Sequence, residues 1–98
     1  MADTTKIKGY ITMRQFTFTI RDELGIHARP AGLLAKMAKE YKETTITVTK
    51  GESTIKASQL MKLMGLGAKR GDEVVVAAEG PDEDAAIEKL KEFFEANL

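Results

Sequence analysis

Apolar and polar side chains alternate along two short segments, a period of two that is typical of strands with one buried face. In the first segment Phe16, Phe18 and Ile20 fall on one side, and threonines fall on the other. A further segment around Val74–Val76 is apolar almost throughout, as expected for a strand in the middle of a sheet. The expected strands are residues 15–20, 45–49, Ser53–Lys56 and 73–78, and the second and third form a hairpin around a Lys-Gly-Glu turn.

Apolar residues in three other segments recur at the spacing of an α-helix. The second of these segments is short, is apolar on more than one side, and has Ser58 in front of it as the expected N-cap. The third begins after Gly80-Pro81 with three acidic residues, which the positive end of a helix dipole stabilises. The expected helices are residues 28–41, with a stripe of Ala31, Leu34, Ala35, Ala38 and Tyr41, residues 60–66, and a closing helix with Ile87, Leu90 and Phe94 buried.

The order of these elements predicts an α+β fold, with helices on one face of a largely antiparallel sheet and a polar opposite face. A chain of 98 residues is long enough for one such domain, which we expect to occupy residues 13–98. Residues 1–12 show no period, so we expect an N-terminal extension that is flexible. The chain lacks a signal-peptide core and any apolar run long enough to enter a membrane.

Charge and composition exclude several classes of function. The 15 basic and 15 acidic residues cancel, so no overall field favours nucleic acid or an anionic membrane. The absence of cysteine and the presence of a single histidine argue against disulfides, a zinc site or another metal centre, and no cofactor is expected. These features fit a monomeric protein of the reducing cytoplasm.

The single histidine, His27, stands where the first helix is expected to begin, in the string Gly25-Ile26-His27-Ala28-Arg29-Pro30. A helix start exposes unpaired N–H groups and a positive dipole end, which attract anions and favour an uncharged imidazole. Such an imidazole can attack phosphorus, and the N–H groups of Ala28 and Arg29 can hold the captured phosphoryl group. The Arg29 guanidinium adds a forked donor, and Pro30 needs no N–H partner in a first turn.

Other interpretations of His27 remain open from the residues alone. His27 can be a helix cap beside a solvated arginine, although histidine is a mediocre cap. A general base or a hydrolytic triad needs partner residues that the sequence does not place.

The His27 motif is accompanied by a second one, Leu60-Met61-Lys62-Leu63-Met64-Gly65-Leu66-Gly67, and by the stretch from Gly80 to Leu90. Together these segments resemble HPr, the histidine phosphocarrier family of the bacterial phosphoenolpyruvate-dependent sugar phosphotransferase system. The resemblance covers essentially residues 13–98, and the pair of motifs at this separation is highly specific.

The resemblance implies that His27 accepts a phosphoryl group on Nδ1 from the phosphohistidine of enzyme I and passes it to the IIA domains of sugar permeases. It implies that Arg29 stabilises that group and that the helix start cradles it. The chain would then be a stoichiometric carrier without enzymatic activity of its own. The implied fold is an open-faced β-sandwich of four antiparallel strands and three helices.

A carrier that meets several partners needs a modest, adaptable interface, and methionine suits such a surface. Candidates on the short helix are Leu60, Met61 and Met64, with Leu63 and Leu66 expected to be buried and both methionines at least partly exposed. Basic residues that can steer acidic partners are Lys36, Lys39 and Lys62.

Many relatives of this family from Gram-positive bacteria carry a regulatory serine at the start of the short helix. Alignment through Leu60-Met61-Lys62-Leu63 places Gln59 at that position, whereas counting from His27 places Ser58 there. The alignment without a gap in the helix favours Gln59, so this regulation is not carried over from the family. Ser58 stays a candidate regulatory residue only because a phosphoryl group there can affect partner docking by charge repulsion.

Two alternative functions are a regulatory relative, acting in a nitrogen-related phosphorelay or binding partners according to its phosphorylation, and a plain interaction domain with an incidental histidine. The residues do not reveal which sugars would be served.

Overall fold

The computed structural model describes residues 13–98, so the extension expected for residues 1–12 lies outside the described residues. Each predicted strand and helix forms, and the ends for which the sequence gives a residue lie within one residue of expectation. The elements are β1 (Arg14–Thr19), α1 (Ala28–Glu40), β2 (Thr45–Lys50), β3 (Ser53–Lys56), α2 (Leu60–Gly65), β4 (Glu73–Glu79) and α3 (Glu83–Asn97).

The four strands form one antiparallel sheet in the order β1-β4-β2-β3. β4 lies between β1 and β2, which agrees with the apolar run at its centre. In this register Val76 of β4 lies between Phe16 of β1 and Val48 of β2, so all three side chains share one face. That face is the inner one, since Val48 and Val76 have no exposed surface.

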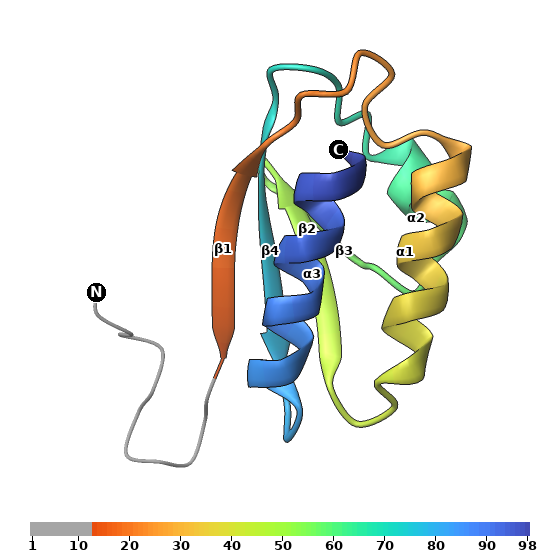
Figure 1. The fold of residues 1–98 in the computed structure, drawn as a ribbon. Helices are drawn as coiled ribbons and strands as arrows, with labels where there is room; N and C mark the ends of the chain where they lie inside the picture. The colour runs from red at the N-terminus through yellow and green to blue at the C-terminus, as the bar shows by residue number, and fades with distance from the viewer. Residues whose placement is uncertain (1–12) are drawn as a thin grey trace.

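The helices cover this inner face and leave the other face of the sheet open (Figure 1). α3 packs against β1 and β4, while α1 and α2 lie against each other beside it. The structure therefore has the open-faced α+β sandwich that the sequence predicts, with four antiparallel strands and three helices.

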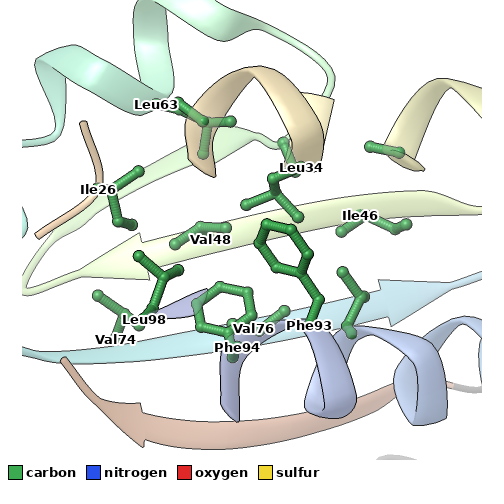
Figure 2. Packing of buried hydrophobic residues seen from close by; sticks show 14 of the residues in the cluster. Ile26, Leu34, Ile46, Val48, Leu63, Val74, Val76, Phe93, Phe94 and Leu98 are labelled. Carbon is green, nitrogen blue, oxygen red and sulfur yellow. The ribbon is translucent and has the colours of Figure 1, made fainter. Parts of the chain in front are cut away.

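The core lies between the sheet and the helices (Figure 2). Phe94 of α3 is fully buried and meets the rings of Phe16 and Phe18 edge-on, at centroid distances of 5.7 and 5.3 Å. Leu34 of α1 and Leu63 of α2 are also fully buried. These contacts join each helix to the sheet and hold the ends of α1 and α2 in place.

The predicted helical stripes are confirmed in most positions. Ala31, Leu34, Ala35 and Ala38 are buried on α1, as are Ile87, Leu90 and Phe94 on α3. Leu66 was expected to be buried and is only partly so, because α2 ends at Gly65 and Leu66 follows it at the edge of the core.

The N-cap expected at Ser58 is wrong. Gln59 occupies the cap of α2, with extended backbone angles (φ −106°, ψ 101°) and no side-chain capping bond. The neighbouring Ala57 is fully buried and donates its N–H to the carbonyl of Ile46 (2.8 Å), which continues the sheet up to that point. Pairing with β2 therefore delays the helix by one residue beyond the position that cap preference favours.

The open face of the sheet is polar, as predicted. Thr17 and Thr19 on β1 and Thr45 on β2 are exposed there, and the hydroxyls of Thr49 and Thr54 lie 2.8 Å apart across β2 and β3. Within residues 13–98, no helix is both long and apolar enough to cross a membrane.

Candidate functional site

His27 is the N-cap of α1, as the sequence predicts. Its backbone is extended (φ −102°, ψ −173°), and its carbonyl accepts the first helical hydrogen bond, from the N–H of Ala31 at 2.9 Å. The imidazole makes no capping bond to the helix, and His27 is half-buried as a residue. The ring is therefore not occupied by a capping bond, which the interpretation as a simple cap would require.

The first turn of α1 offers unpaired donors beside this ring. Within the described part of the chain, the backbone N–H groups of Ala28 and Arg29 have no hydrogen-bond acceptor, and both residues are exposed. The next residue, Pro30, has no N–H and is buried against the core. Two backbone N–H donors and the positive end of the 13-residue helix α1 therefore lie next to His27, the residue that caps this helix.

The side chain of Arg29 supplies a full positive charge at the same place. It is exposed and forms no ion pair with any carboxylate among residues 13–98. A guanidinium that is free of protein partners can bind an incoming anion without first breaking a salt bridge.

The loop before His27 is held closely against the segment that links α2 to β4. Gly25 has a positive φ of 67°, and a side chain there would overlap the carbonyl oxygen of Ala68. That same carbonyl accepts the N–H of Ile26 at 3.0 Å, and the Ile26 side chain is buried. The position of His27 is therefore set by a backbone approach that only glycine permits.

A second anchor comes from the end of α3. The carbonyl oxygen of Leu98 accepts the N–H groups of Arg21 and Asp22 at 2.6 and 2.8 Å, and the Arg21 guanidinium donates to the carbonyl of Glu95 at 2.7 Å. Asp22 in turn accepts the N–H of Leu24 at 2.8 Å. The His27 loop is thus held by the link between α2 and β4 and by the end of α3, which limits its freedom before any partner binds.

Exposed apolar side chains gather on the elements around His27. Met61 is 76% exposed, and Leu60 and Met64 are each 39% exposed on α2, which lies beside α1 (Figure 1). Sequence reasoning missed Leu24, which is 68% exposed in the His27 loop, and Leu33 on α1. Leu24 belongs to no periodic pattern. The sequence distinguishes it only as an apolar residue in an otherwise polar turn.

The predicted basic residues lie on α1 and α2. Lys36 and Lys39 are exposed on α1, with Lys39 in its last turn, and Lys62 is exposed on α2. Ser58 is half-buried and lies apart from the start of α1, in a pocket at the other end of that helix that Ala38, Lys39, Tyr41 and Lys42 also line. The structure therefore groups His27, Ala28 and Arg29 at one end of α1 and places Ser58 near its opposite end.

This arrangement is suited to receiving an oxyanion. An accessible ring nitrogen can form a bond to phosphorus, while two N–H donors and a guanidinium stabilise the negative oxygens. No cluster of three or more metal-ligating side chains occurs among residues 13–98. The fold and the site together define a class of small open-faced α+β sandwiches in which a histidine stands at an anion-binding helix start.

Comparison with known proteins gives the family. The family model described as "PTS HPr component phosphorylation site" matches residues 14–96. The phosphocarrier protein HPr of Mycoplasma genitalium is 38% identical over 87 residues, covering 87% of this chain and 97% of that protein. HPr of Mycoplasma capricolum is 36% identical over 80 residues, or 82% of this chain and 89% of that protein.

Solved structures agree with this assignment. A crystal structure of HPr from Thermoanaerobacter tengcongensis superimposes with a TM-score of 0.79 at 35% identity, covering 85% of this chain and 92% of that one. The chain belongs to the HPr family and functions as a phosphocarrier of the phosphotransferase system.

The close approach at Gly25 leads to a prediction about stability. Gly51 also has a positive φ, of 61°, but has open space around it, so Gly51→Ala should cost only about 1–2 kcal/mol of unfolding free energy. Gly25→Ala carries the same strain and in addition must displace Ala68, so its loss should be clearly larger. Urea denaturation of both variants measures the difference, and equal losses would show that the contact with Ala68 is not a constraint.

Proposed function

We propose that His27 is the phosphoryl acceptor of this phosphocarrier, and that enzyme I supplies the group while IIA domains of sugar permeases receive it. The observation that carries the proposal is the accessible, unbonded imidazole of His27 beside the free N–H groups of Ala28 and Arg29. The family assignment supports the same partners.

The transfer exchanges one phosphorus–nitrogen bond for another. The neutral Nδ1 of His27 attacks the phosphorus of the donor phosphohistidine, a bond forms to Nδ1, and the bond to the donor nitrogen breaks. The donor imidazole leaves with the electron pair of that bond. The same step in the other direction, with a IIA histidine as nucleophile, discharges the carrier, so the protein is a stoichiometric reactant.

The site must stabilise the phosphoryl group without retaining it. Two N–H donors and the exposed guanidinium of Arg29 stabilise the negative oxygens in the transition state and in the phosphorylated protein. Since the Arg29 side chain is exposed, solvent weakens its hold on the group. That balance suits a carrier, which must be charged and discharged by different proteins in turn.

Partner docking is assigned to the apolar surface of Leu24, Leu33, Leu60, Met61 and Met64, together with the basic residues Lys36, Lys39 and Lys62. Flexible methionines adapt to partners of different shape, and lysines around them steer acidic surfaces toward His27. Such an interface is small enough to dissociate quickly after each transfer.

Incubation with phosphoenolpyruvate and enzyme I tests the assignment of His27. We expect one phosphoryl group per chain, labile in acid and stable in base, visible by phosphorus NMR. His27→Gln removes the nucleophilic ring and should abolish the adduct while leaving the circular dichroism spectrum unchanged. Labelling of His27→Gln to the wild-type extent would place the acceptor elsewhere.

Arg29→Ala tests the role of the guanidinium. Removing one charge-assisted hydrogen bond of about 1.5–3 kcal/mol should slow transfer by about ten- to a hundredfold. The unfolding free energy should change by less than about 0.5 kcal/mol, because the side chain is exposed. Arg14→Ala, at the far end of β1 from the His27 loop, is the matched control and should transfer at the wild-type rate.

Met61→Asp tests the docking surface. Placing a charge on the most exposed apolar side chain of α2 should raise the KM for transfer from enzyme I by about tenfold, equivalent to about 1.4 kcal/mol, and leave kcat nearly unchanged. Thr17→Asp adds the same charge on the open face of the sheet and should have no effect. An equal rise in KM for the two variants would exclude a specific role for α2.

A further inference from the structure

A pocket lies near the end of α1 that is opposite to His27. It has a volume of about 330 Å³ and lies between the last turn of α1, the start of β2, and the junction of β3 with α2. This volume is at the lower end of the range for small-molecule sites, about 300–1,000 Å³. Its lining residues do not include His27, Ala28 or Arg29, and of the residues assigned to partner docking only Lys39 lines it.

Positive charge is concentrated in this pocket. Lys39 of α1, Lys42 of the following loop and Lys56 of β3 all line it, and no carboxylate does. None of the three forms an ion pair with a carboxylate in residues 13–98. Since basic and acidic residues balance over the whole chain, the excess is local.

Helix electrostatics explains only part of this clustering. The negative end of the α1 dipole favours Lys39 in the last turn and Lys42 just beyond it. Lys56 comes from a different element, β3, and also lines the pocket. The dipole contributes about half a negative charge, which is less than the charge of a single lysine, so the net charge of the residues that line the pocket is positive.

The remaining lining supplies hydroxyl groups and an apolar wall. Tyr41, Thr45 and Ser58 bring side-chain hydroxyls that can donate to phosphate oxygens. The ring of Tyr41 and the buried side chains of Ala38 and Ile46 provide a surface for a carbon skeleton. Ammonium groups, hydroxyls and an apolar wall in one small pocket match a compact phosphate ester better than a bare ion.

We propose that this pocket binds a small phosphorylated metabolite of the size of a sugar monophosphate. α1 has 13 residues, so the pocket lies about 20 Å from the start of the helix and can be occupied while His27 carries a phosphoryl group. The proposal does not depend on phosphoryl transfer, and its failure would leave the assignment of His27 intact.

Two-dimensional amide NMR of the full chain, titrated with glucose 6-phosphate, tests the proposal. We expect saturable shifts confined to residues 38–46 and 56–58, with no response to glucose and weaker binding of inorganic phosphate. Shifts confined to Ala28 and Arg29 would mean that the ester binds at the helix start instead. Absence of shifts at saturating ester, or equal binding of inorganic phosphate, would overturn the proposal.

Paired charge variants provide the control. The double variant Lys42→Gln/Lys56→Gln removes two exposed ammonium groups from the pocket and should weaken binding by about tenfold or more. Lys89→Gln/Lys91→Gln removes the same charge from α3, outside the pocket, and should bind as the wild type does. Equal weakening in both variants would show unspecific attraction and overturn the proposal.

Discussion

The carbonyl of Ala68 is the contact on which the position of His27 depends. It accepts the N–H of Ile26 and lies so close to Gly25 that no side chain fits between them. His27 follows immediately, so this approach decides where the imidazole stands relative to the start of α1. The N–H groups of Ala28 and Arg29 then need no partner from the protein, because their place in the helix already directs them outward. A short stretch of backbone therefore positions the imidazole beside two free N–H groups.

The structure separates binding tasks along α1. Its first turn places His27 beside two free N–H donors and one guanidinium, and exposed apolar side chains of α2 lie beside it. The pocket at its other end is lined by Lys39, Lys42 and Lys56, whose positive charge comes from side chains and opposes the helix dipole.

Much of the fold is accessible from the sequence because each element buries a single face. Alternation around Phe16 and Phe18 and the helical spacing from Ala31 to Ala38 are local signals, and both survive in the structure. The position of His27 could also be predicted, since Gly25 and Pro30 bracket a helix start. Strand order could not, because it depends on which apolar faces meet, and several pairings satisfy the same alternation.

The features that the sequence did not predict have a common physical cause, which is that contacts between separate elements decide them. Ser58 is a better cap than Gln59 by local preference, yet pairing of Ala57 with Ile46 overrides it. Leu24 belongs to no periodic pattern, so only the folded loop shows that it is exposed next to His27. The pocket is lined by Lys39, Lys42 and Lys56, which belong to different elements of the chain, so no local pattern predicts it.

The pairing of β1 with β4 has a consequence for how the molecule folds. Arg14 pairs with Ala78, more than sixty residues away, whereas the hairpin of β2 and β3 closes over a few residues. The entropic cost of closing so long a loop makes the pairing of β1 with β4 slower than that of the hairpin. Nearly the whole chain must come together before β1 and β4 pair. Because Ala68 lies just before β4 and its carbonyl holds Ile26, a half-folded chain lacks the contact that positions His27, and the proposed phosphoryl transfer would report on completed folding as well as on chemistry.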